Sequence, residues 1–276
     1  MKTLNERLWQ HIEEPGGGAE VIAVGDVHGE LAGLKAVLRH AEIVDARGRW
    51  AGGSRVIVQV GDVIDRGPQS IEAWEYLATL QRQAKKRGGR VVRLLGNHEL
   101  ELLKGHDYLT TLNPNEIAPF VARLREDILG GNVLAAFLSD AGLTGEPILF
   151  THAGLRSSLR HQLLDGAVET ELDGRINTLL RDAVRSDDYS HPIFLAGRSR
   201  GGTRPIGGLF WEDARELFSS ADAGKIRQVF GHSVRMGITQ SEDGRLIDVD
   251  AGMCRVYGGR RSYLRIRRGI PEAVSL

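Results

Sequence analysis

The sequence predicts an α/β fold, and three observations support this prediction. Five short hydrophobic runs of strand length recur along the 276 residues. Segments with apolar residues at helical spacing separate the early runs. The steps from Asp26 to Asp62 and from Asp62 to Asn97 are about 35 residues, close to the ~30 residues of a βαβ unit. The length fits one large α/β domain or two small ones, and we expect a single domain over 1–276.

The predicted elements begin with an N-terminal helix and linker over residues 1–18. Apolar residues four apart predict a helix over 1–14, and a proline followed by three glycines ends it. The hydrophobic runs then predict strands at 21–24, 56–60, 91–95, 148–150 and 229–230. Helical periodicity between the first three runs predicts helices at 31–41 and 70–86.

Residues 100–145 are predicted to form a helical cap, inserted beside the strand ends. An Asn-Pro pair starts one helix there at Pro114, and residues 133–138 add a further apolar patch to this mostly helical segment. A second helical stretch is expected at 156–184. Residues 187–208 are polar and rich in glycine and arginine, which predicts a long loop.

The C-terminal part, 226–266, alternates short strands with glycine turns. Its segments 245–249 and 262–266 are expected to extend a second sheet. The stretch from Arg260 to Arg268 alternates charged and apolar side chains. This alternation predicts an amphipathic strand at the edge of a sheet.

Composition and charge exclude several classes of protein. The chain has 36 basic and 36 acidic residues, so its net charge is zero and no basic field favours nucleic acid or an anionic membrane. No stretch reaches the roughly 18 apolar residues of a membrane span, and residues 1–14 lack the apolar core of a signal peptide. The single cysteine, Cys254, excludes an internal disulfide and suits a reducing compartment. We therefore expect a cytoplasmic protein.

Each of the five hydrophobic runs is followed at once by a small residue and a metal-ligating residue. Catalytic residues of parallel α/β sheets lie at the carboxyl ends of the strands, so these side chains are expected on one rim. The six candidate ligands are Asp26, His28, Asp62, Asn97, His152 and His232. Carboxylate, amide and imidazole ligands suit two divalent cations. We expect Mn²⁺, and the same ligands also admit Fe or Zn.

The spacing of the ligands suggests how they divide between two cations. Asp26 and His28 are two residues apart, so on a strand end both side chains point to the same side and can bind one cation. Asp62 is expected to bridge the pair. Asn97 is a neutral ligand, which binds the second cation without adding charge that repels phosphate. One such motif alone is compatible with an ordinary turn, but five in this order are hard to obtain by chance.

Three of the motifs resemble those of the phosphoprotein phosphatases within the calcineurin-like metallophosphoesterases. The family pattern appears as Gly-Asp-Val-His-Gly at 25–29, Gly-Asp-Val-Ile-Asp-Arg-Gly at 61–67 and Gly-Asn-His-Glu at 96–99. His-Ala-Gly-Leu at 152–155 and Val-Asp-Ala-Gly-Met at 249–253 resemble the bacterial, Shewanella-like branch. The resemblance covers most of the chain.

The resemblance implies an αββα sandwich, in which helices flank two mixed β-sheets and two cations lie at the strand ends. It implies that one cation is held by Asp26, His28 and Asp62, and the other by Asp62, Asn97, His152 and His232. A hydroxide that bridges the cations is then expected to attack phosphorus in line. The implied reaction is hydrolysis of a phosphomonoester.

The resemblance also assigns roles to residues that bind no metal. His98 is expected to protonate the leaving group, and Asp65 to orient the His98 imidazole. Arg66 matches the family arginine that clamps the phosphate with its planar fork of donors. The family has a second arginine just after a tryptophan, but the corresponding tryptophan here is followed by two acidic residues. We favour Arg198 or Arg200 in that role.

Three functions remain open on sequence alone. The leading interpretation is a phosphatase that acts on a phosphorylated protein, at Ser/Thr or Tyr, or on a small phosphoester. The alternative is a diadenosine tetraphosphate hydrolase, because Pro68 after the Arg-Gly pair is typical of that branch, whereas Asp65 and Glu99 favour the phosphatase. A pseudophosphatase scaffold ranks third, because every ligand and His98 are present. No nucleic-acid or membrane partner is expected, and the oligomeric state is left open.

Overall fold

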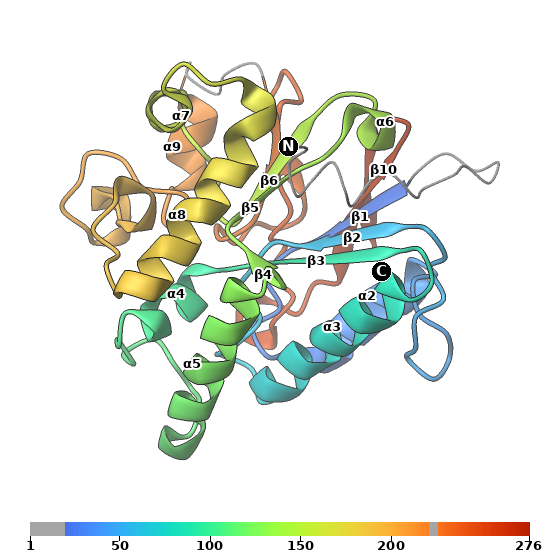
Figure 1. Ribbon diagram of the computed structural model, residues 1–276. Coiled ribbons are helices and arrows are strands. Elements are labelled where there is room, and N and C mark those ends of the chain that lie inside the picture. Colours follow the sequence, from blue (N-terminus) through green and yellow to red (C-terminus); the bar gives the residue numbers. More distant parts are fainter. Residues whose placement is uncertain (1–19, 221–225) are drawn as a thin grey trace.

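The computed structural model describes residues 20–220 and 226–276. Its strands form two sheets that stack face to face, with helices on the outer faces (Figure 1). The predicted αββα sandwich is therefore confirmed. The helix expected over residues 1–14 lies outside the described residues.

The first sheet carries the N-terminal strands in parallel. Its six strands have the order β11 (Ile270–Ser275), β10 (Ser262–Arg267), β1 (Glu20–Val24), β2 (Val56–Gln59), β3 (Arg90–Leu94) and β4 (Val133–Leu134). β1 pairs in parallel with β2, and β2 in parallel with β3, as the repeated strand and helix units predict. Their carboxyl ends consequently lie at one rim of the sheet.

The second sheet contains the strands that precede His152 and His232. Its five strands have the order β5 (Ala136–Leu138), β6 (Ile148–Thr151), β7 (Arg227–Phe230), β9 (Leu246–Asp248) and β8 (Thr239–Gln240). β6, β7 and β9 are parallel to one another, whereas β5 and β8 pair antiparallel at the two edges.

Helices cover the outer faces of both sheets. The α-helices are α2 (Leu31–His40), α3 (Ser70–Lys85), α4 (Asn97–Leu103), α5 (Pro114–Leu129), α6 (Ala141–Thr144), α7 (Ser157–Leu164), α8 (Leu172–Ser186) and α9 (Ala214–Ser219). Short 3-10 turns are η1 (Glu169–Glu171), η2 (Pro192–Phe194), η3 (Arg198–Arg200) and η4 (Arg255–Tyr257). α3 packs on β3 of the first sheet and α8 on β5 of the second. None of the described helices combines the length and the apolar character that a bilayer crossing needs.

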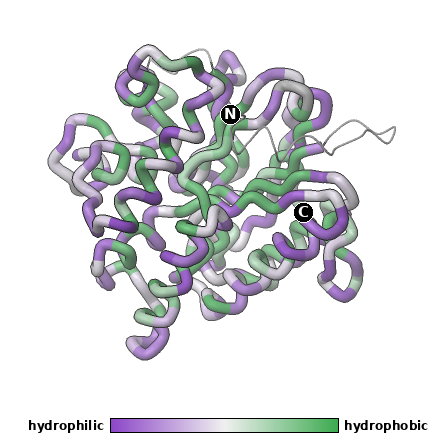
Figure 2. The backbone as a smooth tube through the Cα atoms, viewed as in Figure 1, coloured by the Kyte–Doolittle hydropathy of each residue, from purple (hydrophilic) through white to green (hydrophobic). Residues whose placement is uncertain are grey.

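Alternate side chains of one strand enter two different cores. In β1, Val21 and Ala23 pack between the sheets with Phe150, while Ile22 and Val24 pack against the helices. A strand that is buried on both faces reads as a continuous hydrophobic run, which is why these strands are visible in the sequence. Figure 2 shows the hydrophobic residues concentrated in the central strands and the hydrophilic ones on the outer helices.

Two predictions about individual segments are wrong. Segment 262–266 belongs to the first sheet, where β10 pairs antiparallel with β1, and β11 covers its other side so that it is no edge strand. Residues 133–138 form strands β4 and β5, one in each sheet, and the long helix of the 100–145 segment ends at Leu129. Side-chain alternation indicates a strand but does not say which neighbour it pairs with.

Candidate metal centre

The carboxyl ends of the parallel strands bring the predicted ligands together around Asp62. Its Oδ2 lies 3.6 Å from Nε2 of His28, and its Oδ1 lies 3.7 Å from Nε2 of His152. Two groups of ligand atoms, each within 4.8 Å, share this residue: one includes His28 and His98, the other His152 and His232. The two oxygens of Asp62 thus face two different groups, which is the arrangement that a bridging carboxylate requires.

Asn97 and Asp26 complete the two groups. Oδ1 of Asn97 lies 2.9 Å from Nε2 of His152 and 2.8 Å from Nδ1 of His232. Asp26 Oδ2 lies 4.0 Å from Nε2 of His28, and its carboxylate accepts the backbone N–H of His232 at 3.2 Å. All six predicted ligands therefore meet in one place, contributed by strands of both sheets.

The backbone at the site is held in an unusual conformation. Positive φ angles between 45° and 72° occur at His28, Asp62, Asp65, Arg66 and His232. Each such angle costs a non-glycine residue about 1 kcal/mol or more, and such residues cluster at functional sites.

Glycines before the ligands let the motifs approach one another. A Cβ on Gly96 would lie 2.1 Å from Oδ1 of Asp62, and a Cβ on Gly231 would lie 2.3 Å from Oδ1 of Asp26. Neither distance is compatible with a side chain. The small residue that precedes each of these ligands in the sequence is consequently a requirement of the geometry.

Hydrogen bonds to backbone carbonyls fix two of the ligand histidines. Nδ1 of His28 bonds to the carbonyl of Ile64, and Nδ1 of His152 bonds to that of Val60, both at 2.9 Å. Because Nδ1–H donates in these bonds, each Nε2 keeps a lone pair that is directed into the group. Burial lowers the pKa of His28 to about 4, and it also lowers the pKa values of His152 and His232. Neutral imidazoles are the form that binds metal.

The carboxylates at the site are buried close to one another. Burial raises the pKa of Asp26 well above its usual value, and the charges of Asp250 and Asp62 add to the effect. Burial also acts to raise the pKa of Asp62, but the surrounding histidines outweigh it and hold that pKa below its usual range. Closely spaced buried carboxylates together with neutral imidazoles fit a pair of divalent cations.

His98 differs from the ligand histidines in the partner of its ring. Its Nδ1 lies 2.6 Å from Oδ2 of Asp65, and its Nε2 lies 3.9 Å from Oδ2 of Asp62. Burial acts to lower the pKa of His98, but Asp62 and Asp65 outweigh it and raise that pKa overall. A histidine that holds its proton more firmly than its neighbours suits a proton donor better than a metal ligand.

Thr110 contacts the same pair and was not found by sequence reasoning. Its hydroxyl donates to Oδ1 of Asp65 at 2.7 Å, and the backbone N–H of Thr111 donates to the same oxygen at 3.0 Å. Asp65 therefore accepts from the loop between α4 and α5 with one oxygen and bonds to His98 with the other. No pattern in the sequence distinguishes Thr110 from any other threonine in a loop.

Glu99 connects the second and third motifs. Its Oε1 accepts the backbone N–H of Val63 at 2.8 Å and of Ile64 at 3.2 Å, and its Oε2 accepts the N–H of Gly96 at 2.9 Å and of Asp62 at 3.1 Å. Burial, and then the charge of Asp62, raises the pKa of Glu99 to about 7. Sequence reasoning used Glu99 only to separate two branches, although a glutamate in the first turn of a helix is a recognised N-terminal signal.

Arg66 is exposed beside the first group of ligands. Its Nε donates to the hydroxyl of Tyr257 at 3.1 Å, and the Tyr257 ring lies 5.6 Å from that of His28. Within residues 20–220 and 226–276, its terminal guanidinium nitrogens form no ion pair. Tyr257 is a second residue that sequence reasoning missed, because the contact spans 191 positions of the chain.

Arg200 and Arg198 lie on the same short turn but differ in their surroundings. Arg200 pairs with Oδ2 of Asp213 at 3.2 Å and bonds to the hydroxyl of Ser233. Its charge contributes to the lowered pKa of His232, which burial mainly causes. The side chain of Arg198 is exposed. Of the two candidates, Arg200 is the one that the described contacts connect to the metal centre.

Comparison with known proteins gives a family and several relatives. Residues 19–236 match the family model of the calcineurin-like phosphoesterases. An uncharacterised protein of Schizosaccharomyces pombe is 30% identical over 277 residues, which cover 92% of this chain and 79% of that protein. The solved structure of a cold-active protein-tyrosine phosphatase of a psychrophilic Shewanella has a TM-score of 0.66 at 22% identity, and the match covers 94% of this chain and 82% of that one.

Two named enzymes match over shorter segments. Shewanella-like protein phosphatase 2 of Arabidopsis thaliana is 38% identical over 101 residues, which are 37% of this chain and 25% of that protein. A symmetrical bis(5′-nucleosyl)-tetraphosphatase of Pseudomonas syringae is 38% identical over 84 residues, which are 30% of this chain and 24% of that protein. Each match therefore spans about a quarter of the named enzyme's length.

Proposed function

This chain belongs to the calcineurin-like phosphoesterases and is a metal-dependent phosphoesterase, and we propose that it hydrolyses phosphomonoesters, chiefly those of phosphorylated proteins. The observation that carries the proposal is the placement of Asp62 between two groups of ligands, beside the paired His98 and Asp65. The similarity to a Shewanella-like protein phosphatase supports the choice of substrate class. Whether the phosphorylated residue is Ser/Thr or Tyr is left to experiment.

Two cations fit the site. Asp26, His28 and Asp62 would hold one cation, and Asp62, Asn97, His152 and His232 would hold the other. When bound, such cations supply an activated water molecule and neutralise charge on the phosphoryl oxygens. We propose Mn²⁺ at both positions, and this set of nitrogen and oxygen ligands also admits Fe or Zn.

His98 is the proposed proton donor to the leaving alkoxide. Asp65 holds the Nδ1 side of the ring and so directs Nε2 toward the centre, where Oδ2 of Asp62 lies 3.9 Å away. The same carboxylate favours the protonated ring, which a general acid needs before it acts. Without this proton, an alkoxide of serine or threonine would be a poor leaving group.

Arg66 and Arg200 are the proposed phosphate clamps. Arg66 approaches from the side of His28 and Tyr257, and Arg200 from the side of His232. A planar guanidinium can donate to two phosphoryl oxygens at once. We propose Arg200 in preference to Arg198. Of the two, only Arg200 pairs with Asp213 and bonds to Ser233, the residue that follows His232.

Charge and cysteine content support the proposed partners and compartment. A net charge of zero gives no general attraction for nucleic acid or an anionic membrane. Cys254, the single cysteine, is buried and unpaired, which suits a reducing compartment such as the cytoplasm.

Diadenosine tetraphosphate hydrolysis is the second candidate function. The similarity to a bis(5′-nucleosyl)-tetraphosphatase favours it. Asp65, which bonds to His98, and Glu99, which accepts the N–H of Gly96, favour the phosphatase, because these two residues separate the branches in the sequence.

A panel of substrates tests the proposal. Manganese-loaded protein would be assayed with phosphoserine, phosphothreonine and phosphotyrosine peptides beside diadenosine tetraphosphate. We expect the highest kcat/KM for one of the phosphopeptides. A kcat/KM for diadenosine tetraphosphate that exceeds every phosphopeptide by about tenfold or more, a difference of ~1.4 kcal/mol, would transfer the proposal to the second candidate.

A further inference from the structure

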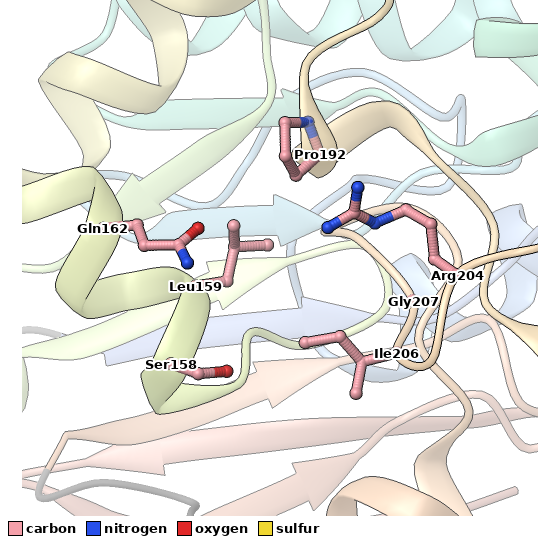
Figure 3. A pocket seen from close by; sticks show the side chains of 7 residues that line it. All are labelled: Ser158, Leu159, Gln162, Pro192, Arg204, Ile206 and Gly207. Atoms are coloured by element: carbon pink, nitrogen blue, oxygen red, sulfur yellow. The ribbon is translucent and has the colours of Figure 1, made fainter.

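Arg204, the third arginine of the 187–208 loop, lines a small cavity outside the metal centre. The cavity has a volume of about 40 Å³ and lies between the first turns of α7 and the loop. Leu159, Pro192 and Ile206 form its apolar walls. Figure 3 shows the Arg204 guanidinium and the Gln162 amide extending toward each other across Leu159.

Among the described residues, no acidic partner neutralises the positive charge of Arg204. Within residues 20–220 and 226–276, no carboxylate forms an ion pair with its guanidinium, whereas Arg200 on the same loop pairs with Asp213. The side chain is half-buried, and the titratable group that faces it is His191. Burial, together with the charge of Arg204, lowers the pKa of His191, so this ring is neutral at pH 7. A half-buried cation beside apolar walls favours an anionic partner.

The first turn of α7 adds to this preference. Ser158 and Leu159 are the second and third residues of the helix Ser157–Leu164, so their backbone N–H groups have no acceptor within it. The N-terminus of a helix carries partial positive charge and binds anions. A cavity of about 40 Å³ exceeds the ~10–15 Å³ that one water molecule needs, which leaves room for a carboxylate or for the oxygens of a phosphate.

Backbone hydrogen bonds connect the segments that line the cavity to the two segments that carry Arg200 and His152. The carbonyl of Arg204 accepts the N–H of Arg198 at 2.9 Å and closes the turn that carries Arg200. On the other side, α7 begins shortly after His152, and the N–H of Ala153 bonds to the carbonyl of Leu209 at 3.0 Å. An anion held there would therefore lie next to the segments that carry Arg200 and His152.

We propose that the Arg204 cavity binds a second anionic group of the substrate, a carboxylate or a phosphate, while the scissile phosphate occupies the metal centre. The inference rests on the proposed function and narrows it. The preferred substrates become phosphoproteins with an acidic or a second phosphorylated residue near the reacting one.

A set of matched peptides tests this proposal on the metal-loaded enzyme. Three phosphopeptides would differ only in the residue at one position beside the phosphorylated residue, which would be Asn, Asp or phosphoserine. p-Nitrophenyl phosphate would serve as a substrate without neighbouring residues. We expect the wild type to prefer the anionic flanks by about three- to tenfold in kcat/KM, the range of a partly exposed charged hydrogen bond. The ratio between the Asp and phosphoserine peptides identifies the better anion.

Substitution of Arg204 should abolish the preference and leave basal activity intact. We expect the Arg204→Gln enzyme to have the same kcat/KM for all three peptides. The Arg204→Lys enzyme should keep part of the preference for anionic flanks. Turnover of p-nitrophenyl phosphate should be unchanged in both variants. Arg82→Gln, at an exposed arginine of α3 that bonds only to Thr79 among the described residues, is the matched control. An Arg204→Gln enzyme that still prefers the anionic flanks would overturn the proposal.

A binding measurement separates this inference from the proposed function. Zinc-loaded protein would be titrated with the α-amide of N-acetylglutamate, a carboxylate without phosphate, while the backbone amides of Ser158 and Leu159 are followed by NMR. We expect shifts in the wild type that disappear in Arg204→Gln. Their absence in the wild type would overturn the anion site, even if phosphopeptides are good substrates. Shifts without phosphopeptide turnover would instead leave the anion site standing and reject the proposed function.

Discussion

Four histidines share one site, and the partner of Nδ1 differs between three of them. His28 and His152 donate to backbone carbonyls through Nδ1, so the Nε2 lone pair of each neutral ring is directed into the site. His98 bonds to the carboxylate of Asp65, which favours the protonated ring. A difference of one hydrogen-bond partner would thereby distinguish the proposed metal ligands from the proposed general acid.

His98→Asn tests the acid role. We expect the turnover of phosphoserine peptides to fall by roughly 10²–10⁴-fold, the usual contribution of a general acid, with both metals retained. The loss should be smaller for p-nitrophenyl phosphate, whose leaving group needs little protonation. Steady-state kinetics combined with metal analysis would measure both effects. An equal loss on good and poor leaving groups would argue against the role.

Thr110→Val tests whether the loop between α4 and α5 positions this pair. The hydroxyl of Thr110 donates to Asp65 at 2.7 Å, and loss of one such bond costs about 1 kcal/mol, or roughly fivefold in rate. We expect kcat on phosphoserine peptides to fall by that factor with KM unchanged, and Thr110→Ser to restore it. Thr111→Val is the control, because Thr111 donates to Asp65 only through its backbone. Equal losses in the two valine variants would indicate a merely structural loop.

The clustering of the six candidate ligands could be predicted from the sequence, whereas their supporting contacts could not. Five of the six candidate ligands follow a hydrophobic run after one small residue, and His28 lies two residues after Asp26, so local pattern and the geometry of parallel strands are sufficient to place them. Thr110 reaches Asp65 across 45 positions, and Tyr257 reaches Arg66 across 191. Such contacts depend on loop conformations that no local pattern specifies.

At the scale of elements, the parallel strands β1, β2 and β3 were predictable, whereas the pairing of β10 and of the short strands β4 and β5 was not. β1, β2 and β3 are buried on both faces and read as hydrophobic runs, and α2 and α3 follow them with helical period. β10 was placed in the wrong sheet because its alternating pattern suits any antiparallel neighbour. β4 and β5 are too short to show a period, and one residue between them suffices to cross from one sheet to the other.

Gly96→Ala tests the close approach of the second and third motifs. A Cβ at this position would meet Oδ1 of Asp62 at 2.1 Å, so either α4 or the bridging carboxylate must move. We expect metal content to fall below two per chain and the melting temperature of the metal-loaded protein to drop. Gly174→Ala in α8 is the control, because a Cβ there meets nothing within 4 Å and should stabilise the helix by about 0.5–1 kcal/mol. If Gly96→Ala kept two tightly bound metals, the motifs would not be packed as described.

On the scale of the whole molecule, the site joins the two sheets. Asp26, Asp62 and Asn97 follow strands of the first sheet, whereas His152 and His232 follow strands of the second. Cations bound between them would therefore link the halves of the sandwich, and their removal would leave buried carboxylates without counterions.

The stability of metal-free protein should consequently depend on pH. Burial raises the pKa of Glu99 and of Asp250 to about 7, from 4.5 and 3.8, so the folded chain binds more protons than the unfolded one up to that pH. The buried histidines with lowered pKa values act in the opposite sense, mainly below their ordinary pKa of 6.5, and this effect fades as the pH rises above it. We expect the free energy of unfolding with chelator to fall between about pH 6.5 and 8.

Urea denaturation at these two pH values, with and without added manganese, measures this dependence. Bound cations require deprotonated ligands, so the metal-loaded protein should lose the decline or reverse it. A metal-free chain that is more stable at pH 8 than at pH 6.5 would contradict the assignment of buried, partly protonated carboxylates.

The central claim, a two-cation phosphoesterase centre around Asp62, is tested most directly by removal and return of metal. Protein treated exhaustively with chelator would be titrated with Mn²⁺ while p-nitrophenyl phosphate hydrolysis and bound metal are measured on the same samples. We expect no activity in the empty protein and full recovery as the content reaches two per chain. Full activity in protein whose site is shown to be empty would contradict the claim.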